Sequence, residues 1–166
     1  MRYFATRKKH TATVLALLLL AAAFIFSCLA ALPVGWKGLF QVLTLASLVA
    51  MIQIAQRYLL SGYEYILDPS EELLTYNRLT VIRVVGQRRT SVFMTPLSSL
   101  TQVIPYRKLS EVKKEFGCIG TRMDFSADLL PPVSYLLLFE VHGEQSLVRL
   151  QCDETFAEAL RERAGI

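Results

Sequence analysis

Two long apolar runs dominate the first 60 residues of the chain. They cover residues 11–32 and 39–60, and Lys37 and Arg57 are the only charged side chains from residue 11 to residue 60. A helix needs about 20 consecutive apolar residues to cross a membrane, so each run is long enough. A proline and two glycines between residues 33 and 38 interrupt the pattern. The pattern therefore predicts two membrane-spanning helices joined by a short turn.

Beyond residue 62 the long apolar runs give way to short alternating segments. Such alternation is typical of strands that bury one face. The predicted strands cover residues 63–67, 73–85, 88–94, 101–106, 134–141 and 146–152, with a further strand within residues 118–125. The segment at residues 107–117 has two interpretations, a loop or a short amphipathic helix. Mostly antiparallel pairing of these strands is expected.

The chain is predicted to close with an amphipathic helix. Four apolar residues share one face at helical spacing, namely Phe156, Ala159, Leu160 and Ala164. Two interpretations of the helix start remain open: Asp153 acts as the N-cap, or Thr155 and Glu158 form a capping box. Gly165 is the expected stop.

These elements predict an α+β chain in three parts. Residues 1–10 form a basic N-terminus, residues 11–62 a transmembrane helical hairpin, and residues 63–166 a mostly antiparallel β domain closed by the C-terminal helix. At about 100 residues, the β domain is large enough to bury a core of its own.

The basic residues predict how the chain lies in the membrane. Arg2, Arg7, Lys8 and Lys9 precede the first apolar run, whereas the connecting turn carries only Lys37. Short segments rich in Lys and Arg stay on the cytoplasmic side. We therefore expect a multi-pass protein of the cell membrane with both termini in the cytoplasm. A cleaved secretory signal is the alternative, but the second apolar run, which follows almost at once, favours the hairpin.

The net charge of +4 says little about partners. Six of the 18 basic residues precede residue 63, which leaves 12 basic residues against all 14 acidic ones in the β domain. The β domain is therefore slightly acidic. A nucleic-acid partner, which requires a basic stripe on the domain itself, is not expected.

Candidate chemistry is sparse. The three cysteines lack the spacing of a disulfide framework or a zinc site. Asp124 and Asp128 lack the further oxygen ligands that calcium prefers. The chain contains no phosphate-binding glycine loop and no nucleophile elbow. We expect a non-catalytic protein without a metal or cofactor.

The stretch VVGQRRTSVF, residues 84–93, has two interpretations. It is either a loop that holds a phosphate or lipid headgroup, or a tight turn at Gly86 and Gln87 between two strands. The turn is favoured, because the preceding segment at residues 68–72 is acidic and would repel a phosphate. The basic residues kept as candidates for contact with the membrane or a partner are Arg88, Arg89, Arg107, Lys108, Lys113 and Lys114.

The second apolar run carries polar side chains that predict helix packing. These residues are Gln41, Thr44, Ser47 and Gln53. Buried amides and hydroxyls in a membrane form hydrogen bonds between helices. A transport pathway would require ionisable groups at membrane depth, and this run has none there.

The order of the elements resembles bacterial membrane-anchored pleckstrin-homology-like domain proteins with two leading transmembrane helices. The matching features are the two apolar runs, the β-rich segment at residues 63–106, the hairpin at residues 134–152 and the helix that follows Asp153. The runs GQRRTSVFMTPLSSL and PPVSYLLLFEVHGE also look like segments of two-span membrane proteins of anaerobic bacteria. The resemblance implies a bent sheet plugged by the C-terminal helix, and binding of lipids, peptides or proteins. The acidic segment at residues 68–72 departs from the basic loop with which such domains bind headgroups.

The leading hypothesis is a membrane-anchored interaction or regulatory module. Its β domain would dock a protein partner or the membrane surface. The alternative is a small accessory subunit of a larger membrane complex, assembled through the polar face of the second helix. Homo-oligomerisation is left open.

Overall fold

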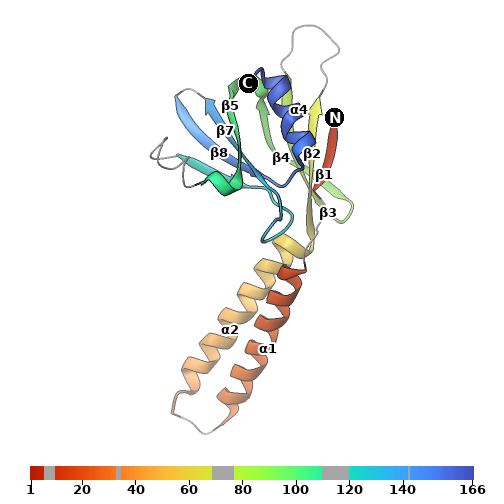
Figure 1. The fold of residues 1–166 in the computed structure, drawn as a ribbon. Coiled ribbons are helices and arrows are strands. Elements are labelled where there is room, and N and C mark those ends of the chain that lie inside the picture. The colour runs from red at the N-terminus through yellow and green to blue at the C-terminus, as the bar shows by residue number, and fades with distance from the viewer. Residues whose placement is uncertain (6–9, 33–34, 69–76, 110–119, 142) are drawn as a thin grey trace. The chain divides into compact units, whose positions relative to one another are not determined.

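The computed structural model describes residues 1–5, 10–32, 35–68, 77–109, 120–141 and 143–166. The chain divides into two compact units. One comprises residues 1–8, 62–127 and 131–166 and forms the β domain; the other comprises residues 9–61 and 128–130 and contains the two long helices (Figure 1). The fold class is α+β, as predicted, with two apolar helices followed by mostly antiparallel sheets and a C-terminal helix.

The two long helices pack against each other through small side chains. Helix α1 covers Thr11–Ala31 and α2 covers Lys37–Ile54, with a π-helical turn, η1, at Ala55–Leu59. The buried residues of α1 are all alanines: Ala12, Ala23 and Ala30. Small residues let two backbones approach closely. Both helices are long and apolar enough to cross a membrane, by length and composition.

Sheet A contains four strands in the order β1-β2-β3-β4. Their bounds are Arg2–Ala5, Ser61–Asp68, Arg78–Val85 and Arg88–Pro96. The predicted turn at residues 86–87 is confirmed, because Val85 pairs directly with Arg88 and Gly86 adopts a φ of 59°. A positive φ favours glycine, and two-residue hairpin turns of this kind require it. Of the long strand predicted over residues 73–85, residues 73–76 lie outside the described part.

Sheet B contains four strands in the order β5-β7-β8-β6. Their bounds are Leu100–Pro105, Tyr135–Val141, Glu144–Leu150 and Thr121–Asp124. The predicted hairpin of β7 and β8 is confirmed, and β5 pairs with β7, also antiparallel. Strand β6 departs from the expected pattern, because it runs parallel to β8. Short 3-10 turns, η2 at Leu97–Ser99 and η3 at Tyr106–Lys108, flank β5.

The strand β1 was not anticipated from the sequence. Residues 2–5 were interpreted only as part of a basic N-terminus, because a four-residue segment is too short to show a clear alternation. In the structure β1 pairs antiparallel with β2, with Ala5 opposite Tyr63. The Tyr3 ring stacks on Tyr65, with ring centroids 6.0 Å apart, and lies 5.2 Å from the ring of Phe156. The N-terminal residues therefore belong to the β domain.

The main core lies between the two sheets and the C-terminal helix α4, Glu154–Ala164 (Figure 1). Tyr65 is fully buried, yet its hydroxyl donates to the Phe125 carbonyl at 2.7 Å and accepts from the Gln151 amide at 3.2 Å. Burial raises the pKa of this phenol well above its ordinary value, so Tyr65 stays neutral. It ties sheet A to sheet B at a position where an unpaired hydroxyl would be costly.

Helix α4 begins and ends as the sequence predicts. The Asp153 carboxylate accepts a hydrogen bond from the Phe156 amide at 3.0 Å, which decides between the two proposed caps in favour of Asp153. Gly165 ends the helix in the left-handed conformation, with a φ of 76°. Phe156 and Leu160 are fully buried, as expected, and Ala157, which lies outside the predicted apolar face, is buried with them.

Candidate functional site

The β domain has a pocket beside the ends of β5 and β7. It is lined by residues 105–107 and residues 131–135 and has a volume of about 380 Å³. Three of the lining residues are prolines: Pro105, Pro131 and Pro132. The Tyr106 amide donates to the Ser134 carbonyl at 2.9 Å, which joins the two walls. Because proline restricts the backbone, these walls are largely formed before any ligand arrives.

An arginine holds the aromatic wall of this pocket in place. The Arg149 guanidinium lies 3.7 Å from the centre of the Tyr106 ring, which is a cation–π contact. Its Nη1 donates to the Asp124 carboxylate at 3.3 Å, and its Nε donates to the Ser134 hydroxyl at 3.3 Å. The other Asp124 oxygen accepts from the Ser126 hydroxyl at 2.6 Å. Arg149 is thus a positioning residue whose charge is balanced by Asp124.

This group of residues was not found from the sequence. Arg149 sits in the strand SLVRLQC, where a single basic residue is read as exposed, and Asp124 was judged only as a weak cation ligand. The strand pairing brings them together, since β6 pairs with β8 so that Asp124 and Arg149 are direct partners. Asp124 and Arg149 are 25 residues apart, and no short sequence motif predicts a contact between them.

The predicted basic cluster at residues 107–114 is described only in part. Arg107 and Lys108 form the end of η3 and are exposed, and Arg107 lines the pocket. Lys113 and Lys114 lie outside the described residues. The structure therefore places Arg107 beside a candidate binding pocket.

Arg88 and Arg89 begin strand β4 directly after the Gly86 turn, and both are exposed. An Arg89 Nη1 lies 3.5 Å from the carboxylate of Glu64, whose side chain is fully buried. Neither carboxylate oxygen of Glu64 has a hydrogen-bond partner among the described residues. A buried carboxylate without a counter-charge is strongly unfavourable. Arg89 therefore compensates Glu64, a role that the sequence did not reveal.

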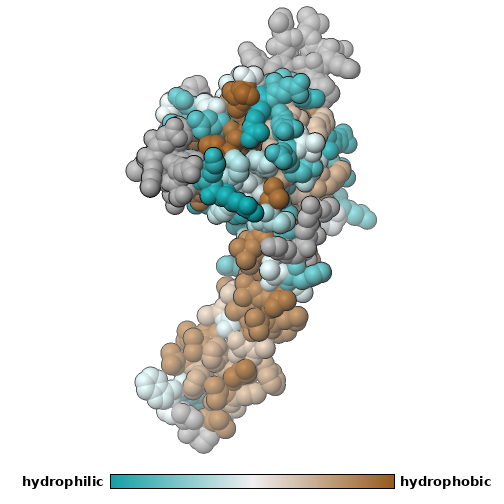
Figure 2. All heavy atoms as spheres, in the orientation of Figure 1, coloured by the Kyte–Doolittle hydropathy of each residue, from teal (hydrophilic) through white to brown (hydrophobic). Residues whose placement is uncertain are grey.

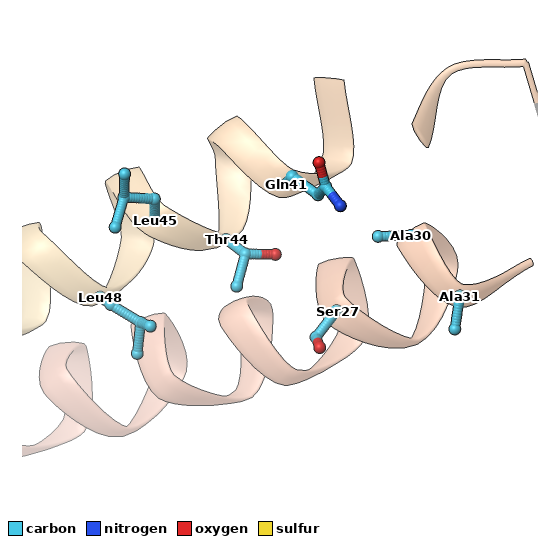
Figure 3. A pocket seen from close by; sticks show the side chains of 7 residues that line it. All are labelled: Ser27, Ala30, Ala31, Gln41, Thr44, Leu45 and Leu48. Carbon is cyan, nitrogen blue, oxygen red and sulfur yellow. The ribbon is translucent and has the colours of Figure 1, made fainter. Parts of the chain in front are cut away.

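Two of the four polar residues predicted to pack α2 line a cavity against α1. Gln41 and Thr44 line a cavity of about 420 Å³ between the two helices, with Ser27 of α1 on the other side (Figure 3). The Thr44 hydroxyl already donates to the Phe40 carbonyl at 2.8 Å. Ser47 is half-buried outside the cavity lining, and Gln53 is exposed. Gln53 follows Gln41 by twelve residues, and each residue rotates by about 100° around the helix axis. The two side chains therefore point roughly 120° apart around α2.

Among the described cysteines, Cys152 is buried and Cys28 is exposed. Cys152 lies in the core, and burial, with a smaller contribution from Asp153, raises its pKa to about 12. The thiolate is the reactive form of cysteine, so Cys152 is a poor nucleophile at neutral pH. Its contribution is packing.

No family model, curated protein or solved structure matches the chain. Function is therefore inferred from the geometry of the domain and its pocket.

Proposed function

We propose that this chain is a non-catalytic, membrane-anchored interaction module. Helices α1 and α2 form a transmembrane hairpin, and the β domain docks a protein partner beside the membrane. The observation that carries the proposal is the pairing of β1 with β2, the two strands that flank the helix pair.

This pairing constrains the topology. The chain leaves sheet A after Ala5 and returns to it at Ser61, and Ala5 lies opposite Tyr63 in the sheet. Two membrane crossings return the chain to the side on which it began, whereas a single crossing would separate β1 from β2. The basic residues at positions 2–9 support the cytoplasm as that side, since short segments rich in Lys and Arg stay cytoplasmic. A cleaved signal would remove Tyr3 from the core, which disfavours that alternative.

The pocket at residues 105–107 and 131–135 is the proposed docking site on the β domain. It combines preformed proline walls, a fixed aromatic ring and one exposed arginine, Arg107. Protein interfaces are enriched in Tyr and Arg. The two sheets closed by α4 are also compatible with a pleckstrin-homology-like domain, although the parallel strand β6 departs from a purely antiparallel arrangement.

The docking proposal is tested by photocrosslinking in cells. A benzoylphenylalanine at Val133, an exposed residue of the pocket wall, is expected to give a discrete cross-linked species. The matched control carries the same group at Glu140, an exposed residue of β7 outside the pocket lining. The species should disappear in a Tyr106→Ala variant whose thermal unfolding shows that it is folded. Equal crosslinking from Val133 and Glu140 would contradict the proposed site.

A second candidate is an accessory subunit of a larger membrane complex or of a homo-oligomer. The cavity between α1 and α2 favours it, because the exposed Gln41 amide lies there beside Thr44 and Ser27 (Figure 3). Under this hypothesis Gln41→Leu weakens assembly in detergent, whereas Gln53→Leu, on another face of α2, does not. If both variants keep the wild-type assembly size, the second candidate fails.

A further inference from the structure

The β3–β4 hairpin is a basic part of the β domain. Residues 78–96 contain four arginines, Arg78, Arg83, Arg88 and Arg89, and no acidic residue. Residues 63–166 as a whole contain 12 basic and 14 acidic residues. Three of the four arginines lie within the seven residues from position 83 to position 89, which include the turn. Even with Glu64 paired to Arg89, this end of the hairpin is positive.

Strand directions place this basic turn at a defined end of sheet A. The carbonyl oxygen of Val84 lies 4.0 Å from the position that a Cβ of Gly62 would occupy, so the turn is beside the start of β2. The opposite end of the sheet is marked by Arg163 of α4, which donates to the Leu67 carbonyl at 3.5 Å and accepts from the Asn77 side chain at 3.2 Å. Strand β3 therefore runs antiparallel to β2.

The chain enters and leaves the helix pair at the same end as the basic turn. Ala5, the last residue of β1, pairs with Tyr63 near the start of β2. Gly62 follows Leu59, the last residue of η1, by only three residues. A residue spans at most about 3.6 Å, so the chain itself holds Gly62 within roughly 11 Å of Leu59. At physiological salt the Debye length is about 8 Å, so the attraction requires the arginine side chains to come within about that distance of the charged surface.

We propose that the β3–β4 turn binds anionic phospholipid headgroups of the membrane that holds α1 and α2, with Arg88 as the principal contact. This inference rests on the proposed membrane anchoring. Arg89 is partly neutralised by Glu64, whereas Arg88 is exposed. In the sequence, Arg7, Lys8 and Lys9 stand between β1 and α1. Clusters of basic residues beside a membrane span are attracted to anionic leaflets.

The contact is electrostatic attraction to a surface, without a headgroup pocket of its own. It would hold the β domain with one end of sheet A toward the bilayer, so that the opposite end, near Pro96 and residue 98, points into the cytoplasm. The Pro105–Tyr106 region would then be oriented by the same contact. This contact would give the β domain a preferred orientation relative to the membrane surface.

The test uses the full-length protein in vesicles, with a fluorophore on a single cysteine in a background lacking the natural cysteines. One label replaces Gln87 in the turn, and the control label replaces Ser98, which is exposed beyond the far end of β4. The eight steps along β4 separate the two ends by about 27 Å. Quenching of the fluorophore by spin-labelled headgroups is measured in two kinds of vesicle. One is pure phosphatidylcholine, and in the other roughly one lipid in three is the anionic phosphatidylglycerol.

The expected result is stronger quenching at position 87 than at position 98. Anionic lipid should increase the quenching at position 87 further. Salt at about 1 M should remove this increase, because it shortens the Debye length to about 3 Å. Arg88→Gln should reduce the increase several-fold, whereas Arg78→Gln, the same charge change at the far end of the hairpin, should leave it intact. Equal quenching in both lipids, or stronger quenching at position 98, would overturn the inference. If Arg88→Gln instead abolishes crosslinking to a protein and leaves quenching unchanged, the turn contacts a protein and the lipid assignment is wrong.

The same vesicles separate this inference from the proposed function. Resistance to alkaline extraction reports the anchoring by α1 and α2. Protein that is extracted contradicts the anchoring itself, whereas protein that stays in the vesicles without lipid-dependent quenching contradicts only the lipid contact.

Discussion

The helix pair and the β domain place their apolar side chains in opposite ways. On α1 and α2 the large apolar residues are exposed: Phe24 has 72% of its surface exposed, and the buried positions of α1 are alanines. In the β domain the large apolar residues are inside, and Tyr65 and Phe156 are fully buried. Figure 2 shows the difference directly, with a brown surface on the helices and mixed colours with much teal on the β domain.

The difference shows that hydrophobic content alone does not define a core. The β domain removes its apolar surface from water by folding, and this burial drives its stability. The helix pair cannot do so, because two helices bury only one stripe of each. Its exposed apolar surface is unfavourable in water, which is the physical reason for proposing that the helix pair lies in a membrane.

The largest expected effect comes from removing the helix pair. Because Ala5 lies opposite Tyr63, residues 6–62 can be replaced by Asn-Gly, which would turn β1 and β2 into an ordinary hairpin. We expect a water-soluble domain that unfolds cooperatively and has lost all membrane association. Fractionation and thermal unfolding check this. A joined domain that aggregates or shows no cooperative transition would contradict the view that the β domain has a self-sufficient core.

The next largest effect is expected when a phenylalanine is replaced by alanine in the β domain, compared with the same replacement in the helix pair. Phe156→Ala removes a fully buried ring and should lower the free energy of unfolding of the β domain by about 3–5 kcal/mol. Phe24→Ala removes an exposed ring of α1 and should leave it unchanged. Both variants are measured by denaturant unfolding of the full-length protein in detergent, followed by a signal from the β domain. Similar losses would contradict the comparison.

A smaller effect tests the unpredicted strand β1. Tyr3→Ala removes a half-buried ring that packs on Tyr65 and Phe156, and should cost roughly 1–3 kcal/mol in the joined domain. Phe4→Ala, one residue along on the exposed face, should cost less than about 0.5 kcal/mol. Equal unfolding midpoints for the two variants would show that β1 is not part of the core.

The smallest effect concerns the start of α4. Asp153→Ala removes the side chain that accepts from the Phe156 amide and should destabilise the joined domain by about 1 kcal/mol. Asp153→Asn keeps an accepting oxygen and serves as the control. If Asn and Ala are equally destabilising, the carboxylate charge rather than the hydrogen bond is responsible.

The sequence predicts best the features that depend on local pattern. The two apolar runs, the Gly86 turn, the β7–β8 hairpin and the Asp153 cap each follow from adjacent residues, and the structure confirms them as helices, turn, strands and cap. The membrane location of the apolar helices stays a prediction.

The features that were missed depend on contacts between distant segments. Strand β1 becomes visible only once β2 exists as its partner, and β2 lies more than 50 residues away. The parallel register of β6 with β8 brings Asp124 to Arg149, and the packing of sheet A buries Glu64 beside Arg89. The sequence alone does not distinguish a charged residue that is buried in a sheet from one that is exposed on its surface.

The central claim is that α1 and α2 cross the membrane twice and return the chain to the side of the β domain. It is tested by a membrane-impermeant thiol reagent on single-cysteine variants in right-side-out and inside-out vesicles. Trp36→Cys reports the connection between the helices and Ser98→Cys reports the β domain; both side chains are exposed. The account predicts that Trp36→Cys is labelled only in right-side-out vesicles and Ser98→Cys only in inside-out vesicles. Labelling of both positions from the same face would contradict it.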